Sequence, residues 1–406
     1  MITYIDWRKY MIKKKYNAEI WDTMQYIFSD FNDHQIHCVI NFDNHIDELC
    51  LKKSLKKSKQ LFPLIGANYV ETFFKAYWQE GDFNVDDIVK IIETKYPENE
   101  IENFVVSRTY ENIGSQVLLL IARSEIKDSI CIIINHMLCD GAGFKDYIAI
   151  VASIYSSFKA GEDIKAFEIG SRNLEAVFNN YNIFKKIKIL SSSSKLSKYN
   201  SKVSMVFDKG TEKPFIVRQD IDKGNFIAIK KYAKAMNATV NDIIVAAYIR
   251  VLDKFLNIKG VPIPCALNLR KYVKDEKLHL TNFTSNLICD LGEEIGENFD
   301  ETLLKVKKTM DKEKNKYSPL KPILMLEIIF KIFPYKIAKY IVMKNFKNPL
   351  IAMTNIGIID NEKINFYGLK VLDAFMTGSI KKKPYFQISA TTFNNKLTLC
   401  INLLVL

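Results

Sequence analysis

A histidine followed four residues later by an aspartate is the clearest candidate for acid–base chemistry. His136 and Asp140 lie in the stretch Ile130–Tyr147 (ICIIINHMLCDGAGFKDY). There an apolar run of strand length leads into a glycine-containing turn and then a helical pattern. Loops at strand ends often carry reactive groups on a rigid scaffold. An imidazole also ionises near neutral pH without needing burial. The pattern therefore predicts a general base at His136.

Other interpretations of this segment stay open at this point. A lone histidine at a strand end can be incidental to function. His136 and Asp140 are both metal-ligand types, but no third ligand accompanies them, so no metal site is predicted. Cys139 is a candidate nucleophile, but no separately placed base supports that role.

The elements that must position these residues alternate between strand and helix patterns, which predicts an α+β fold. Strands are expected over residues 37–42, 69–77, 117–122, 130–134, 215–220, 262–268, 285–291, 351–355, 385–393 and 396–405. Helices are expected over residues 46–60, 86–94, 143–158, 225–235 and 240–256.

The 406-residue length favours two or three domains. The composition changes to serine and lysine over residues 186–213, which contain the chain's midpoint. This segment is the predicted linker or crossover. It separates an N-terminal lobe (residues 1–185), which carries the histidine motif, from a C-terminal lobe (residues 214–406).

The charge is basic, with 58 lysines and arginines against 46 acidic residues and a net charge of +12. A nucleic-acid-binding protein is expected to use arginine for base edges and phosphates, but lysine dominates here. The basic runs are short and scattered, as in Lys381-Lys382-Lys383. The pattern favours a solvated surface over a patch with a partner, and nucleic-acid binding is not expected.

Residues 1–17 have no continuous apolar stretch, so a secretory signal is not expected. The seven cysteines form no CxxC pair, which favours reduced, buried thiols and a cytoplasmic location. Residues 323–343 are apolar but contain four charged residues and Pro334, so a transmembrane helix is not expected. A broken amphipathic helix is predicted instead, which could pack in the core, line an apolar substrate or contact a membrane peripherally.

The segment Asn135–Gly141 (NHMLCDG) resembles the HHxxxDG motif of the chloramphenicol-acetyltransferase-like superfamily. This group includes stand-alone condensation-domain proteins and alcohol acyltransferases. Further segments resemble the family in the same order along nearly the whole chain: Phe62-Pro63-Leu64, residues 238–247 (ATVNDIIVAA), Asn268-Leu269-Arg270, residues 282–286 (NFTSN) and residues 354–357 (TNIG).

The resemblance implies two similar lobes, each a mixed sheet with flanking helices, and an active-site tunnel between them. By position, His136 matches the catalytic histidine, which takes a proton from a hydroxyl or amine acceptor. Asp140 matches the structural aspartate, with Arg270 as its candidate partner in a bidentate pair. The Gly141 N–H could face the developing oxyanion. Other candidates to line the site are Asn135, Ser285, Asn286, Thr354 and Asn355.

The implied activity is acyl transfer from acyl-CoA or a phosphopantetheinyl carrier protein, which are co-substrates, with no permanently bound cofactor. Two departures from the family pattern matter. Asn135 replaces the first histidine of the motif, and the DFGWG motif of plant-type members is absent, with residues 375–384 (FMTGSIKKKP) in its place. The second departure favours the bacterial condensation or alcohol-acyltransferase branch. The first leaves an alternative, a catalytically inactive fold that binds a carrier protein or lipid.

Overall fold

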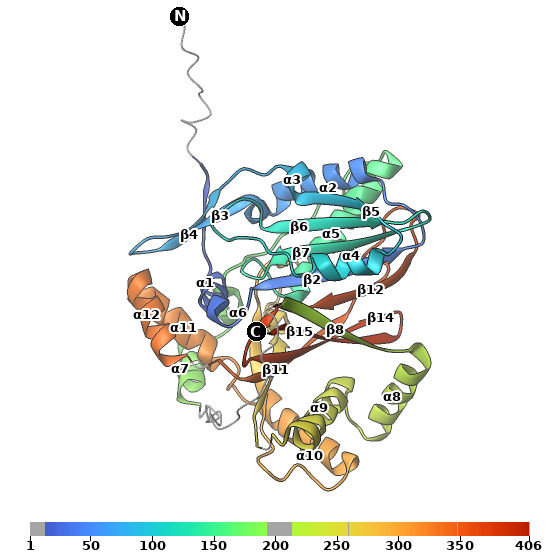
Figure 1. Ribbon diagram of the computed structural model, residues 1–406. Coiled ribbons are helices and arrows are strands. Elements are labelled where there is room, and N and C mark those ends of the chain that lie inside the picture. The colour runs from blue at the N-terminus through green and yellow to red at the C-terminus, as the bar shows by residue number, and fades with distance from the viewer. Residues whose placement is uncertain (1–12, 193–212, 259, 347, 406) are drawn as a thin grey trace, which may run out of the picture.

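The part of the chain that the structure describes forms three β-sheets (Figure 1). The computed structural model describes residues 13–192, 213–258, 260–346 and 348–405. The strands are β1 (Lys15–Asn17), β2 (Gln35–Phe42), β3 (Ala67–Glu71), β4 (Ala76–Glu80), β5 (Val89–Glu93), β6 (Val117–Arg123), β7 (Asp128–Asn135), β8 (Lys213–Ile221), β9 (Ile263–Asn268), β10 (Thr284–Cys289), β11 (Ile351–Ile358), β12 (Val371–Thr377), β13 (Lys381–Lys382), β14 (Phe386–Phe393) and β15 (Lys396–Val405).

The helices flank these sheets, and the predicted α+β class is confirmed. They are α1 (Ile20–Ile27), α2 (Glu48–Leu61), α3 (Val85–Ile88), α4 (Pro97–Phe104), α5 (Gly141–Ala160), α6 (Glu175–Phe178), α7 (Ile183–Ser191), α8 (Lys223–Ala235), α9 (Val240–Leu256), α10 (Phe299–Lys314), α11 (Lys321–Ile332) and α12 (Tyr335–Asn345), with short 3-10 turns η2 (Phe28–Asp30), η3 (Pro63–Gly66) and η4 (Leu269–Tyr272).

The five-stranded sheet has the order β12-β2-β7-β6-β5 and carries the histidine motif. Its central strand β7 is buried at every position, as its unbroken apolar run predicts. Helices α2 and α5 pack on one face, and α4 covers the other. The end of β7 and the start of α5 are therefore held by core packing on both sides.

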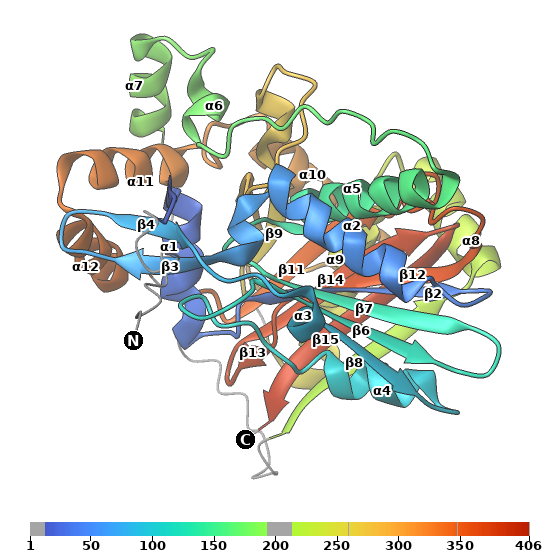
Figure 2. The same cartoon turned by 90° about the horizontal axis from the view of Figure 1, so that it is seen from above.

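The two halves of the chain share this sheet. Strand β12 comes from the C-terminal half but pairs antiparallel with β2 (Figure 2). The division into lobes at 1–185 and 214–406 does not anticipate this crossing, because edge pairing depends on long-range contacts that leave no local pattern. The other predicted boundary, the linker 186–213, lies mostly outside the described residues. Its first residues to Ser191 continue α7, and β8 begins at Lys213.

The second large sheet has the order β10-β9-β11-β14-β15-β13, and β8 pairs with β15. Helices α8, α9 and α10 contribute to the core on its face. A third sheet, β1-β4-β3, lies beside α1 and α12. The single strand predicted over 69–77 is the hairpin β3–β4, because the chain turns between Thr72 and Lys75.

The helix predicted over 86–94 is only partly present. Helix α3 ends at Ile88, and β5 follows directly and pairs parallel with β6. Three of the five residues of β5 are β-branched (VKIIE), which favours a strand once an open sheet edge is available. The interruption predicted at Pro334 is present, since this residue separates α11 from α12.

Among the described residues, no single helix has the length and apolarity needed to cross a membrane. One helix pair, bent by 99° between Lys223–Ala235 and Val240–Phe255, meets those criteria jointly by length and composition alone.

A buried ion pair fixes α1 against the motif turn. Asp22 is fully buried and accepts hydrogen bonds from both terminal nitrogens of Arg172 (2.8 and 3.1 Å) and from the Trp78 indole (2.8 Å). Arg172 also donates to the carbonyl of Leu138, inside the motif, at 3.0 Å. Segments far apart in sequence thus support the turn that follows β7.

Replacing Asp22 with alanine should lower the free energy of unfolding by about 3–5 kcal/mol, because it leaves the Arg172 charge buried without its partner. Urea denaturation measures the change. Asp311→Ala is the matched control, since Asp311 pairs with Lys307 at the surface of α10 and should change stability little. Equal unfolding midpoints for the two variants would contradict the proposed support.

Candidate active site

His136 lies in the turn between the end of β7 and the start of α5. Asp140 ends this turn as the N-cap of α5, where its carboxylate accepts the Gly143 N–H at 2.9 Å. The His136 N–H donates to the carbonyl of His34 at 2.8 Å. Backbone bonds at both ends therefore determine where the imidazole leaves the main chain.

Asn282 fixes the orientation and the tautomer of His136. Its side-chain amide donates to the carbonyls of His136 (2.8 Å) and Met137 (3.1 Å). Its Oδ1 is therefore turned toward Nδ1 of His136, at 3.1 Å. An amide oxygen only accepts, so Nδ1 carries the proton and Nε2 carries the lone pair. This is the tautomer that a base acting through Nε2 requires.

The environment keeps this imidazole neutral. Removal from water is the main cause that lowers the pKa of His136, and the positive charge of Lys381 lowers it further. The negative charge of Asp140 and the bond to Asn282 act in the opposite direction but do not reverse the shift. Since the pKa lies below its usual value of 6.5, the ring is unprotonated at pH 7.

Asp140 and Arg270 form an ion pair across the two halves of the chain. Nη1 of Arg270 lies 2.9 Å from Oδ2 of Asp140, and the same oxygen accepts the Phe283 N–H at 2.9 Å. The pair is not the bidentate one expected. The other terminal nitrogen of Arg270 donates to the carbonyls of His279 (2.7 Å) and Thr281 (2.8 Å), because β9 and β10 bring that segment alongside.

Two glycines at the start of α5 allow close packing. A Cβ on Gly141 would lie 3.0 Å from Cγ2 of Ile356, on β11. A Cβ on Gly143 would lie 2.9 Å from Cβ of Cys139 and 3.1 Å from Nη2 of Arg270. The sequence analysis named Gly141. The structure leaves less room for a side chain at Gly143, because Cys139 and the Arg270 guanidinium lie against it.

The five other residues predicted to line the site lie on β7, β10 and β11. Asn135 is fully buried, donates to Gln116 (2.9 Å) and accepts the Met137 N–H (3.0 Å), so its side chain supports the turn that follows β7. The Ser285 hydroxyl donates to the carbonyl of Pro319 at 2.5 Å.

Asn286 is exposed on β10. Thr354 and Asn355 lie on β11, where Asn355 donates to Asn241 at 3.3 Å and accepts the Gly357 N–H at 3.0 Å. Within the described part of the chain, none of these five candidates forms a hydrogen bond with the imidazole of His136.

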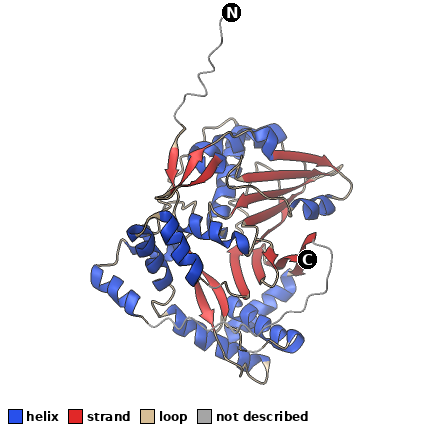
Figure 3. Cartoon of the chain, turned by 60° about the vertical axis from the view of Figure 1, so that its left-hand side comes forward, coloured by secondary structure: helices blue, strands red, loops and turns tan. Residues whose placement is uncertain are grey.

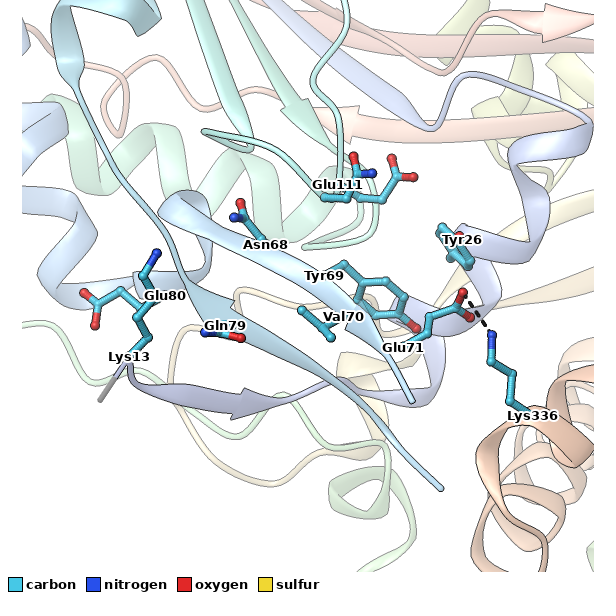
Figure 4. A pocket seen from close by; sticks show the side chains of 11 residues that line it. Lys13, Tyr26, Asn68, Tyr69, Val70, Glu71, Gln79, Glu80, Glu111 and Lys336 are labelled. Atoms are coloured by element: carbon cyan, nitrogen blue, oxygen red, sulfur yellow. Dashed lines mark ion pairs between the residues drawn. The ribbon is translucent and has the colours of Figure 1, made fainter. Parts of the chain in front are cut away.

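A cavity of about 540 Å³ lies between the β3–β4 hairpin, α1 and the start of α12 (Figure 4). Most of its lining is polar: Lys13, Tyr26, Asn68, Tyr69, Val70, Glu71, Gln79, Glu80, Glu111, Asn112 and Lys336. Oε2 of Glu111 is 3.3 Å from Nε2 of His34, the residue whose carbonyl holds the His136 N–H. His136 itself is not among the residues that line this cavity.

Comparison with known proteins gives independent evidence on the fold. Residues 280–404 match the sequence model of the WS/DGAT C-terminal domain. No curated protein sequence matches the chain. Trichothecene 15-O-acetyltransferase from Fusarium sporotrichioides superposes with a TM-score of 0.68 at 11% identity, covering 96% of this chain and 91% of that one. The chain has the chloramphenicol-acetyltransferase-like fold of condensation domains and acyltransferases.

Two further structures share this chloramphenicol-acetyltransferase-like fold. Polyketide synthase associated protein 5 from Mycobacterium tuberculosis has a TM-score of 0.63 at 12% identity, over 96% of this chain and 94% of that one. The epimerization domain from the third module of tyrocidine synthetase B has a TM-score of 0.67 at 12% identity, over 97% and 91%. At such identities the likeness establishes the fold, and any chemistry must be argued from the residues.

Two residues near the base were missed by sequence reasoning. Asn282 belongs to the NFTSN segment that carried the family resemblance, but nothing in the sequence linked it to His136. Lys381 belongs to a lysine run that was interpreted as solvated surface. That interpretation fits its neighbour Lys382, whose side chain is exposed. Lys381 is half-buried because β13 pairs with β15 and bridges to Asn32, and burial lowers its pKa to about 8.

Arg270→Ala should lower the free energy of unfolding by about 3–5 kcal/mol, because the buried Asp140 carboxylate would lose its counter-charge. Thermal melting followed by circular dichroism provides the measurement. Lys271→Ala alters the exposed neighbouring residue and is the matched control. An Arg270→Ala variant that melts like the parent would show that the pair does not hold the turn.

Lys381→Met should raise the pKa of His136, because the positive charge that disfavours the imidazolium is removed. NMR titration of the ring protons measures it, with His136→Gln used to assign the signal among the five histidines. Lys382→Met, the exposed neighbour, should leave the pKa unchanged. A Lys381→Met titration that overlays the parent would remove Lys381 from the electrostatics of the site.

Proposed function

We propose that the protein is an acyltransferase that moves an acyl group from a CoA or phosphopantetheinyl carrier-protein thioester to a hydroxyl or amine. His136 is the general base. The observation that carries this proposal is the fixed, neutral imidazole, whose protonated Nδ1 faces Asn282 and whose Nε2 is left as the basic atom. The chloramphenicol-acetyltransferase-like fold supports it.

In the proposed reaction, Nε2 takes the proton of the acceptor O–H or N–H while the acceptor atom attacks the thioester carbonyl. The C–S bond of the tetrahedral intermediate then breaks, and the departing thiolate receives the proton held on Nε2. Bonds and protons balance without an acyl-enzyme. Gly141 is the first residue of α5, where an N–H has no acceptor within the helix, so its amide is suited to the developing oxyanion.

The alternative, a catalytically inactive module for binding a carrier protein or lipid, drew its support from Asn135. The contacts of Asn135 weaken that support, since its amide is committed to Gln116 and to the turn. The seven cysteines are all buried and unpaired, which fits a reducing compartment such as the cytoplasm.

His136→Ala should reduce thiol release from acyl-CoA by about 10²–10⁴-fold, the usual contribution of a positioned base. The assay uses a panel of acyl-CoAs and carrier-bound thioesters with alcohols and amines, and a chromophore that reports the free thiol. Circular dichroism checks that the variant is folded.

Cys139→Ala is the control, because it tests the nucleophile that the motif also contains. Burial raises the pKa of the Cys139 thiol well above its usual value, which leaves it protonated and unreactive, so this variant should retain activity. Full activity in His136→Ala, or its loss in Cys139→Ala, would overturn the assignment of the base.

A further inference from the structure

Exposed aromatic residues project from the tip of the β3–β4 hairpin. Phe73 is 53% exposed and Phe74 is 75% exposed, although both are among the most apolar side chains. Their rings pack edge to face, with centroids 5.1 Å apart, and so present one apolar surface. Single exposed apolar residues are common on soluble proteins, but adjacent ones at a projecting tip indicate an interaction site.

The apolar surface continues onto the junction of α11 and α12. The N–H groups of Tyr335 and Lys336 donate to the carbonyls of Phe74 and Phe73, both at 3.1 Å, so the hairpin tip is fixed against the start of α12. The exposed side chains at this junction are Ile332 (65%), Phe333 (41%), Ile337 (40%) and Tyr340 (64%). Together with Phe73 and Phe74, these four residues form what we call the hydrophobic edge.

The figures place this edge at one side of the molecule. Helices α7, α11 and α12 and the β3–β4 hairpin lie in a row at the left in Figures 1 and 2, and Figure 3 turns that side forward. Helix α7 packs on α11 and adds three exposed apolar residues of its own, Ile183, Phe184 and Ile187.

Lysines outnumber carboxylates around the hydrophobic edge, where Glu71 pairs with Lys336 and Lys339, and Lys331 pairs with Glu175 and Glu327. Residues 328–346 contain four lysines and no aspartate or glutamate, and the hairpin turn 72–75 adds Lys75. Lys75 and Lys344 are exposed and form no ion pair with any described residue. Lys336 is 45% exposed and lies 3.5 Å from Glu71. Aromatic side chains flanked by lysines suit the interface of an anionic membrane.

We propose that the hydrophobic edge docks on an anionic lipid surface. An apolar tip that projects can insert between lipid headgroups, whereas a protein partner would need a matching pocket for it. The lysines then lie at the level of the phosphates. This docking is independent of the proposed acyl transfer, since none of its residues contacts His136 or Asp140.

Sedimentation of the full chain with vesicles tests the proposal. Vesicles of phosphatidylcholine alone are compared with vesicles that also contain phosphatidylglycerol. Binding is expected to the anionic vesicles and to weaken as salt is added. The double variant Phe73→Ser/Phe74→Ser should reduce the partition coefficient at least tenfold. Lys75→Gln and Lys344→Gln should each reduce it about fivefold.

Phe255→Ser is the matched control, because Phe255 is 69% exposed on α9, away from the hydrophobic edge, and should not change vesicle binding. Thiol release with a water-soluble acceptor should be unchanged in all these variants, which separates a failure of docking from a failure of the proposed activity.

Three results would overturn the proposal. The first is no sedimentation with anionic vesicles at low salt, and the second is equal binding by the parent and the Phe73→Ser/Phe74→Ser variant. The third is binding of an acidic carrier protein, but not of vesicles, that these two substitutions abolish. That result would assign the edge to a protein partner.

Discussion

The carboxylate of Asp140 is the point on which the proposed site depends. One of its oxygens accepts the N–H of Gly143 and so begins α5, and the other accepts Arg270 and the N–H of Phe283. A carboxylate this deeply buried is stable only if its lone pairs are satisfied. Its donors come from both halves of the chain. The turn that carries His136 therefore takes its shape only when both halves are assembled.

The segment that contains Phe283 also contacts His136 directly. Asn282, which fixes the tautomer of His136, is the neighbour of Phe283, which binds Asp140. One stretch of backbone thus sets both the orientation of the imidazole and the position of the carboxylate. A second contact between the two halves of the chain comes from Lys145 of α5. Its Nζ donates to the carbonyls of Ile356 (2.8 Å) and Ile358 (3.0 Å) on β11. A third contact is made by strand β12, which pairs with β2 in the sheet that contains β7.

This dependence explains which parts of the site the sequence could predict. The apolar run of β7, the glycine-containing turn and the helical periodicity of α5 are patterns within short stretches of sequence. The order of these elements could therefore be predicted from the residues. The pairing of Asp140 with Arg270 came from the family resemblance, because 130 residues separate them. The contact between His136 and Asn282 spans 146 residues and has no local signal.

Lys381 was misread for the same reason. In sequence it is one lysine in a run of three, and its burial follows only from the pairing of β13 with β15 and Asn32. The contacts of the Asn135 side chain also lack a local signal, since its amide donates to Gln116, 19 residues away, and accepts the Met137 N–H within the turn. Position in a motif identifies a residue's neighbourhood, but the direction of its side chain depends on tertiary packing.

Burial of His136 resolves an apparent conflict between the nearby Asp140 carboxylate and a neutral imidazole. A carboxylate near a histidine normally raises the pKa of the imidazole and favours the cation, which cannot accept a proton. The charge of Asp140 acts in this direction on His136. Burial is the largest cause and outweighs this effect, and the positive charge of Lys381 adds to it, so the pKa of His136 stays below its usual value and the ring stays neutral. Asp140 can therefore shape the turn, paired with Arg270 at 2.9 Å, while the base beside it remains unprotonated.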